Sequence, residues 1–306
     1  MKEFVKSVLR RMPGGELLYR RLVLARLKPG VLGLTTSAER EYYCRVAATQ
    51  FHGVGAVIDL GSWFGSTAAS LAQGLGANPT PQARETLIHT YDIFLWDRDY
   101  DSLSPNIRLR HGESFLPVFK ANVRPWLSRI VVHQGDLNDA EWSEPVELLL
   151  NDAAKTWSLS GAIWRVFVSR LVVGGLLIEQ DFKHYYCPWI HLMHYRLRDY
   201  FELAEDVRGG STTAFRLLKL IPEHLLVRAT QESDYGPEEI QAAFAWAENL
   251  VYAEWRPAIV AAHATLLLRR GDKSSARTLL DALSVEAAAH HEVKMVKVLL
   301  DDARSR

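Results

Sequence analysis

Four aspartates, each at the end of a short apolar run, are the residues of this chain best suited to do chemistry. They are Asp59, Asp92, Asp152 and Asp181. The runs before them have the length and apolar character of buried strands. Ligands of open α/β sheets bind at the carboxyl ends of the strands, so these side chains are candidates for a binding site. Carboxylates there could hold an ammonium group, accept hydrogen bonds from ribose, or orient a hydroxyl that loses its proton.

The first aspartate, Asp59, precedes a glycine loop. Gly61 and Gly65 lie between the strand-like run 56–58 and a helix-like stretch, 66–75. Glycine lets a ligand approach the backbone, and the free N–H groups of a helix start attract negative charge. A dinucleotide loop has the spacing Gly-x-Gly-x-x-Gly, whereas this loop has Gly-x-x-x-Gly. An acid beside it would repel pyrophosphate but could hold an ammonium group. The alternative is an ordinary strand-to-helix turn.

Asp92 closes the second strand-like run, 87–91. An acid at this place hydrogen-bonds ribose hydroxyls in nucleoside-binding α/β folds. The alternative is an aspartate that only ends a strand in a turn. Its combination with the glycine loop favours the ribose interpretation.

Asp152 and Asp181 end two strands that we expect to be adjacent, 146–152 and 176–178. Two converging acids could bind a divalent metal or orient a hydroxyl for deprotonation. The alternative is a pair of solvated or salt-bridged strand ends. His184 follows three residues after Asp181 and is a candidate general base, although a lone histidine is often simply packed.

The elements around these residues predict an α/β fold. We expect a helix over residues 36–52, with Ser37 as its N-cap and Arg40 where a capping box would have glutamate. Residues 76–86 are expected to be a loop. Two strand-like runs around Gly209 and Gly210 predict a β-hairpin. A hairpin at this point adds an antiparallel strand to a Rossmann-like, doubly wound and mostly parallel sheet.

We expect three parts in the chain. Residues 1–52 would be an N-terminal helical segment, 53–222 the binding domain and 223–306 an α-helical C-terminal extension. The basic amphipathic stretch 1–28 could rest on an anionic membrane or, as we prefer, pack on the domain. The helical extensions are candidate contacts for a homo-oligomer.

Composition excludes several classes of protein. The 306 residues have a formal net charge of zero, so no global field attracts nucleic acid. Cys44 and Cys187 give neither a zinc spacing nor a disulfide framework. No apolar run is long enough for a transmembrane helix, and no secretory signal is evident. A cytoplasmic location is the simplest expectation.

Residues from about 35 to 222 resemble the class I S-adenosylmethionine-dependent methyltransferases. The first motif of that family is Asp/Glu-x-Gly-x-x-x-Gly-x-Thr, and Asp59, Gly61, Gly65 and Thr67 match it in full. Within the family, the chain is most similar to the macrocin and sugar O-methyltransferase group found in bacterial glycan and natural-product clusters. The other residues that carry the resemblance are Thr36, Ser37, Ala38, Glu39, Arg40, Tyr91, Asp92, Asp152, Gly174, Gly175, Gln180, Asp181 and Phe182.

The resemblance implies methyl transfer from S-adenosylmethionine (SAM) to a hydroxyl of a small molecule or sugar. The cofactor-binding residues would be Asp59, Gly61, Ser62, Trp63, Gly65, Ser66 and Thr67 for the amino-acid part, Asp92 for the ribose, and Asp136 and Leu137 for the adenine. For catalysis our own hypothesis is that Asp152 and Asp181 position the acceptor hydroxyl, with His184 or Lys155 nearby. Their task would be to align the reactants and to remove a proton.

The resemblance also allows us to ask whether the ligands for a bound metal ion are present. Metal-dependent members of the family use an Asp-Gly-Asp sequence after the fourth strand and an Asp-Asp pair after the fifth. Here the corresponding residues are Asp152-Ala153-Ala154 and Gln180-Asp181, so two carboxylates are missing. A bound Mg²⁺ is therefore doubtful, and we assign no metal ligand.

Two other functions stay open at this point. One is a catalytically silent SAM-binding or scaffold protein, with the helical extension as its partner surface. The other is a nicotinamide-dependent oxidoreductase, which the absence of Gly-x-Gly-x-x-Gly disfavours.

Overall fold

The computed structural model describes residues 33–101, 104 and 107–302. The amphipathic stretch predicted at residues 1–28 lies outside them. The chain forms two compact units that divide between Gly135 and Asp136. The predicted division into residues 1–52, 53–222 and 223–306 stays a prediction.

The first unit contains three parallel strands and the helices that follow them along the chain. Its elements are α3 (Ser37–Thr49), β1 (Ala56–Leu60), α4 (Ser66–Ala77), α5 (Pro81–Glu85), β2 (Ile88–Asp92), α6 (Leu116–Asn122) and β3 (Ile130–Gln134). Strand β2 pairs with β1 on one side and with β3 on the other. Helices α3 and α4 pack closely because Gly74 has no side chain: a Cβ there would lie 2.2 Å from the Cys44 carbonyl oxygen.

The start of α3 differs from the prediction. Its N-cap is Thr36 instead of Ser37, which places Glu39 at the third helical position. The Thr36 hydroxyl accepts a hydrogen bond from the Glu39 N–H (3.2 Å), and the Glu39 carboxylate accepts one from the Thr36 N–H (2.8 Å). This is the reciprocal capping box that the sequence analysis did not expect. The prediction of a loop over residues 76–86 was also wrong. This stretch contains the short helix α5, which begins at Pro81.

The second unit contains four strands and the remaining helices. Its elements are β4 (Val146–Asn151), α7 (Trp157–Val166), β5 (Leu171–Glu179), α8 (Trp189–Arg196), β6 (Phe201–Asp206), β7 (Thr213–Leu217), α9 (Glu223–Ala229), α10 (Pro237–Glu248), α11 (Arg256–Arg269), α12 (Lys273–Asp281), α13 (Val285–Ala288) and α14 (His291–Asp302). Strands β4 and β5 are parallel, whereas β7 is antiparallel to both β5 and β6.

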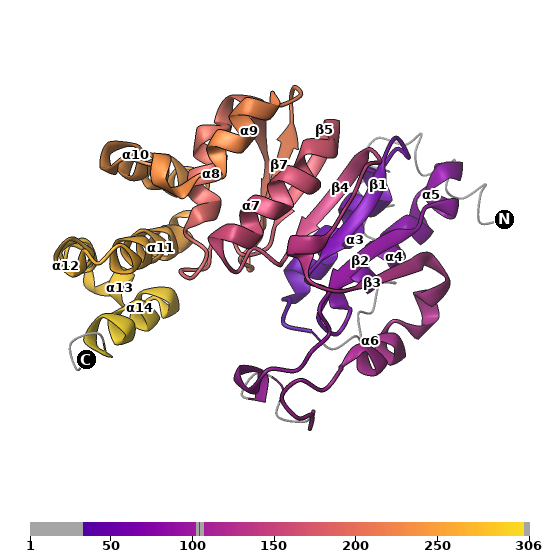
Figure 1. The fold of residues 1–306 in the computed structure, drawn as a ribbon, viewed down its shortest axis with the longest axis horizontal. Helices are drawn as coiled ribbons and strands as arrows, with labels where there is room; N and C mark the ends of the chain where they lie inside the picture. Colours follow the sequence, from indigo (N-terminus) through magenta and orange to yellow (C-terminus); the bar gives the residue numbers. More distant parts are fainter. Residues whose placement is uncertain (1–32, 102–103, 105–106, 303–306) are drawn as a thin grey trace, which may run out of the picture. The chain divides into compact units, whose positions relative to one another are not determined.

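The seven strands follow the order β3-β2-β1-β4-β5-β7-β6 in one sheet (Figure 1). The predicted Rossmann-like, mostly parallel sheet with a C-terminal antiparallel hairpin is therefore confirmed. One detail differs: Gly174 and Gly175 lie inside β5, where the pairing register with β4 shifts. Gly174 has a φ of +87°, which only glycine adopts without strain, so the pair forms an irregular part of the strand.

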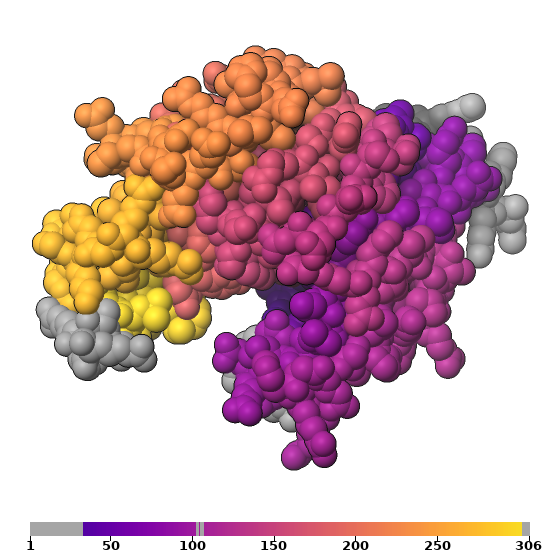
Figure 2. Space-filling model, in the orientation of Figure 1, coloured from indigo at the N-terminus to yellow at the C-terminus, as the bar shows by residue number. Residues whose placement is uncertain are grey.

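The C-terminal helices have a core of their own. Buried side chains from α11, α12 and α14 form it: Ala261, Ala264, Ala276, Leu280, Val293, Val296 and Leu300. These helices appear in yellow in Figure 2. The predicted α-helical extension is confirmed. None of the helices in the described part of the chain has the length and apolar character needed to cross a bilayer.

A buried lysine joins the hairpin to the helical extension. The Lys183 ammonium is fully buried and donates to the Asp206 carboxylate at the end of β6 and to the Val207 carbonyl oxygen (3.0 Å). The other carboxylate oxygen of Asp206 accepts the Tyr252 N–H at 2.7 Å. The ammonium also lies 5.0 Å from the centre of the Trp255 ring. Both charges of this pair are thus satisfied inside the protein.

Replacing Lys183 by methionine is expected to lower the free energy of unfolding by about 3–5 kcal/mol, because Asp206 then keeps a buried charge without its cation. Urea denaturation followed by far-UV circular dichroism measures the change. Lys219→Met is the matched control, since Lys219 is exposed, and we expect it to change stability by about 0.5 kcal/mol or less. A loss in K183M no larger than in the control would contradict a structural role for the pair.

Candidate active site

The loop between β1 and α4 has a backbone that its glycines make possible. Gly61 and Gly65 have φ angles of +80° and +92°, and Trp63 between them also has a positive φ, 48°. The Gly65 N–H donates to the Ser62 carbonyl oxygen at 2.8 Å. A Cβ on Gly65 would lie 2.4 Å from Cγ1 of Val123. The loop therefore needs glycine at this end for both conformation and space.

Asp92 holds this loop from the end of β2. Its Oδ2 accepts the Trp63 N–H at 2.9 Å, and its Oδ1 accepts the Phe94 N–H at 2.8 Å. The Gly61 N–H donates to the Tyr91 carbonyl oxygen at 2.9 Å. Each carboxylate oxygen has more than one lone pair, so Asp92 can still accept hydrogen bonds from a ligand. A carboxylate is thus fixed directly against the glycine loop.

Asp59 lies beneath the loop and is fully buried. Its Oδ2 accepts hydrogen bonds from the hydroxyls of Thr67 (3.1 Å) and Thr90 (2.9 Å). Its Oδ1 is buried and has no hydrogen-bond partner among the described residues. Burial raises the pKa of Asp59 from its ordinary 3.8 to about 6. An ionised carboxylate with one unsatisfied oxygen is suited to a positively charged hydrogen-bond donor.

The raised pKa of Asp59 makes stability depend on pH. The folded protein binds this proton more tightly than the unfolded chain, so stability falls as the pH rises from about 4 to 6 and then levels off. Asp59→Asn removes this dependence. We expect the unfolding free energy of D59N, relative to wild type, to increase by about 3 kcal/mol between pH 4 and pH 7.5. Denaturation curves at the two pH values measure it, and parallel pH profiles would contradict a raised pKa.

Helix α4 begins without a side-chain cap, because its N-cap residue is Gly65. The Ser66 hydroxyl accepts a hydrogen bond from the Thr35 hydroxyl at 3.0 Å, and Ser62 hydrogen-bonds Thr90. The serine side chains of the motif are therefore used inside the fold. The backbone N–H groups of the first turn are the part of this helix suited to a ligand carboxylate.

Trp63 packs in an aromatic cluster that the sequence did not reveal. Its ring centre lies 4.7 Å from that of Phe64, 5.8 Å from Trp96, 4.4 Å from Tyr100 and 5.2 Å from Phe115. Phe64 belongs to the glycine loop itself, whereas Trp96, Tyr100 and Phe115 lie in the segment between β2 and α6. Together with Asp92 they fix the conformation of the glycine loop.

In the second unit, Lys155 joins two of the predicted catalytic carboxylates. Its ammonium donates to Oδ1 of Asp152 at 2.9 Å and also to Asp181. The side chain of Asp181 is 3% exposed, that of Asp152 is 18% exposed and that of Lys155 is 45% exposed. An incoming ligand can therefore reach Asp152 and Lys155 more easily than Asp181.

Asp181 is fixed by further donors. The Tyr186 hydroxyl donates to its Oδ1 at 2.9 Å, and the Cys187 thiol lies 3.8 Å from its Oδ2. Burial alone would raise the pKa of Asp181, but the Lys155 ammonium and the His184 ring outweigh it and lower the pKa. Burial would likewise lower the pKa of Lys155, yet the carboxylates of Asp152 and Asp181 raise it well above its ordinary value. Lys155 is thus held as a cation between two anions and is not poised to act as a base.

His184 contacts a distant carboxylate. Its Nδ1 lies 3.2 Å from Oε1 of Glu292, and its ring stacks on Tyr186 with the centres 5.0 Å apart. Burial would lower the pKa of His184, but the hydrogen bond to Glu292 and the charge of Asp181 raise it. The Glu292 carboxylate therefore stabilises the imidazolium form, and the general-base role of His184 stays a prediction. No pattern in the sequence indicated Tyr186 or Glu292 as site residues.

The two residues predicted at the adenine have a local role. Asp136 caps the short 3-10 helix Leu137–Asp139 by accepting the Asn138 N–H at 2.8 Å, and Leu137 is buried. Their contact with a nucleoside stays a prediction. Among the residues that the structure describes, no group of three or more His, Cys, Asp or Glu side chains could hold a metal ion.

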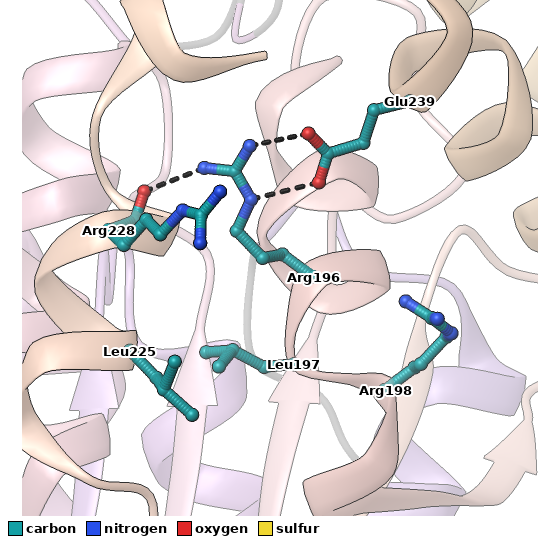
Figure 3. A pocket seen from close by; sticks show the side chains of 6 residues that line it. All are labelled: Arg196, Leu197, Arg198, Leu225, Arg228 and Glu239. Carbon is teal, nitrogen blue, oxygen red and sulfur yellow. Dashed lines mark hydrogen bonds and ion pairs between the residues drawn. The ribbon is translucent and has the colours of Figure 1, made fainter. Parts of the chain in front are cut away.

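A shallow pocket of about 220 Å³ lies elsewhere in the second unit, between α8, α9 and α10 (Figure 3). Its lining residues are Arg196, Leu197, Arg198, Leu225, Arg228 and Glu239. Arg196 donates to Glu239 at 2.9 and 2.6 Å and to the Arg228 carbonyl oxygen at 2.8 Å. None of the predicted site residues lines this pocket, and its central cation is already neutralised.

No protein-family model matches the chain, and no curated protein matches its sequence. Solved structures with a similar fold include the O-methyltransferase NovP, which is 15% identical, with 60% of this chain and 80% of that chain covered and a TM-score of 0.45. Another is CalS11, a TDP-rhamnose 3'-O-methyltransferase of calicheamicin biosynthesis, at 14% identity, 70% and 92% coverage and a TM-score of 0.43. At these values of identity and TM-score the likeness assigns no activity to this chain.

Proposed function

We propose that this chain transfers a methyl group from SAM to a hydroxyl of a small molecule or sugar. The observation that carries the proposal is the contact between Asp92 and the Trp63 N–H at 2.9 Å. It places a carboxylate from the end of β2 directly against the glycine loop after β1. Such a carboxylate suits the hydroxyls of a ribose. The buried carboxylate of Asp59 beneath the same loop disfavours a pyrophosphate and favours a cationic group.

The first unit fits the donor in three respects. Asp92 would accept hydrogen bonds from the ribose. The unpartnered Oδ1 of Asp59 would accept one from the donor's ammonium group, which compensates a buried negative charge. The uncapped N–H groups at the start of α4 would face its carboxylate. Asp136 and Leu137, which begin the second unit, are the residues proposed for the adenine.

The second unit supplies groups for the acceptor. When bound, the donor supplies an electrophilic methyl group on a positively charged sulfur. Asp152 would accept a hydrogen bond from the acceptor hydroxyl and take its proton as the C–O bond forms and the carbon–sulfur bond breaks, which would leave S-adenosylhomocysteine as the neutral thioether. Lys155 holds Asp152 at 2.9 Å and is itself held by Asp181. The arrangement thus orients one partly exposed carboxylate, as proton removal during alignment of two reactants requires.

An acceptor-dependent release of S-adenosylhomocysteine tests the proposal. The full chain is incubated with SAM and a panel of sugars, sugar nucleotides and phenols, and the product is quantified by mass spectrometry. We expect product with at least one hydroxyl-bearing acceptor and a mass increase of one methyl group on it. Binding of SAM without product formation across the panel would favour a silent scaffold protein instead.

A further inference from the structure

Residues 182–187 form the segment that carries the partners of Asp181. Tyr186 donates its hydroxyl to Asp181, and the Cys187 thiol lies against both Asp181 and the Ala154 carbonyl oxygen (3.2 Å). The position of this segment therefore sets the position of the Asp181 carboxylate and, through Lys155, that of Asp152. A contact that fixes residues 182–187 therefore also helps to fix the carboxylates of Asp181 and Asp152.

The C-terminal helices hold this segment at several points. On α14, the buried Glu292 accepts the Tyr185 N–H at 2.9 Å and pairs with His184. On α11, the Arg269 guanidinium donates to the Tyr186 carbonyl oxygen at 3.5 Å. The Tyr185 side chain packs against the apolar core that α11, α12 and α14 share. Residues more than 80 positions later in the chain thus fix the segment next to Asp181.

Among the described contacts between the C-terminal helices and residues 182–187, Glu292 supplies the only carboxylate. Its Oε1 contacts the His184 ring, and its Oε2 accepts the Tyr185 N–H. Burial would raise the pKa of Glu292, but the hydrogen bond and charge of His184 and the Tyr185 N–H lower it. The groups that face His184 are Glu292 from α14, Asp181 from the end of β5 and Lys155 from the segment after β4, with Tyr186 stacked on its ring. Glu292 is also faced by His291 and by His290, whose Nδ1 accepts the Glu292 N–H at 3.3 Å.

We propose that Glu292 is a positioning residue of the acceptor side of the active site, which makes helix α14 part of that site. The inference rests on the proposed methyl transfer for the identity of the site. The geometry itself does not depend on it: Glu292 orders residues 184 and 185, and the next residue, Tyr186, orients Asp181. The helical extension is then a support for catalysis instead of a separate scaffold.

Two substitutions separate the charge of Glu292 from its hydrogen bonds. Glu292→Gln keeps the volume and can still accept the Tyr185 N–H, while its amide faces a neutral His184. Glu292→Ala removes both contacts. Asp301→Asn is the matched control, because Asp301 lies on the same helix, is 66% exposed and pairs only with the surface residue Arg277 in the contacts described.

Amide hydrogen exchange and histidine NMR on the full chain give readouts that need no acceptor. We expect exchange in residues 182–187 to rise roughly tenfold in E292A, the equivalent of one lost hydrogen bond, and to rise less than half as much in E292Q. The His184 titration, assigned with His184→Gln, should move to lower pH in E292Q because its main anionic partner is gone. D301N should match wild type in both measurements.

Kinetics with an acceptor from the panel then link the segment to the site. E292A is expected to raise the acceptor KM and lower kcat by about tenfold each, while the Kd for SAM measured by calorimetry stays within about twofold. E292Q should recover most of the lost kcat, because glutamine can still accept the Tyr185 N–H and keep the segment in place.

Specific results would overturn the inference. They are wild-type exchange in residues 182–187 together with a wild-type acceptor KM in E292A, or an unmoved His184 titration in E292Q. If E292A does not fold, the His184 titration in E292Q still tests the inference. Failure of SAM to bind wild type would count against the proposed function alone, because the exchange and titration data are collected without SAM.

Discussion

Replacing Asp152 by asparagine is expected to lower kcat for methyl transfer by about 10²–10⁴-fold, the range that a positioned proton acceptor contributes. Asp152 is the more exposed of the two carboxylates that Lys155 joins, and its Oδ1 lies 2.9 Å from the ammonium. Asparagine keeps the shape and a hydrogen-bond acceptor for Lys155 but cannot take a proton. Lys155 also keeps its bond to Asp181, so the cluster should stay assembled.

Single-turnover rates and calorimetry distinguish this outcome from a binding defect. The Kd for SAM should stay within about twofold of wild type, since the glycine loop and Asp92 lie in the first unit. Glu202→Gln, at an exposed acid on β6 that pairs with Arg216, serves as the control and should leave kcat unchanged. A D152N protein with wild-type kcat would remove Asp152 from the mechanism.

Replacing Gly65 by alanine is expected to weaken SAM binding by about 100-fold, the equivalent of two to three hydrogen bonds of about 1 kcal/mol each lost when the loop moves. A Cβ at this residue would lie 2.4 Å from Cγ1 of Val123 and 3.1 Å from the ring of Phe119. The φ of +92° is also unfavourable for alanine. The loop would have to move away from Asp92 to relieve both problems.

Gly76→Ala is the matched control for this substitution. Gly76 lies in the same helix, α4, has no positive φ, and a Cβ there would meet no atom within 4 Å. It should bind SAM like wild type and gain about 0.5–1 kcal/mol of stability, because alanine is the better helix former. Calorimetry with SAM measures both variants, and equal affinity in G65A and G76A would show that the loop geometry does not matter for binding.

Local patterns were sufficient to predict the sheet. The apolar runs before Asp59 and Asp92 are short and bounded by turn residues, and each became a parallel strand. The hairpin around Gly209 and Gly210 followed from two runs and a tight turn. These signals depend on residues close in sequence, so they can be read without knowing the fold.

The errors at α3 and α5 have a local cause. Thr36 and Ser37 are both good N-caps, and the choice between them was decided by Glu39, whose side chain reaches back only if the helix starts after Thr36. In α5, Pro81 begins a single helical turn inside a polar stretch that resembles a loop in composition. Sequence patterns do not distinguish two adjacent N-cap candidates, and composition does not distinguish a single helical turn from a loop.

The contacts of the candidate site depend on long-range packing. Glu292 lies 108 residues from His184, and Thr90 lies 31 residues from Asp59. Neither Glu292 nor Thr90 belongs to a sequence motif. Each contacts its partner only because the fold brings distant parts of the chain together. Lys155, in contrast, was already a candidate as a residue near the two aspartates, and the structure places it between Asp152 and Asp181.

Calorimetric titration of the full chain with SAM and, separately, with NAD⁺ tests the central claim most directly. The account predicts saturable binding of SAM, no heat with NAD⁺, and loss of SAM binding in Asp92→Ala, because Asp92 holds the glycine loop and is the proposed ribose contact. Binding of NAD⁺, or SAM affinity that survives Asp92→Ala unchanged, would contradict it.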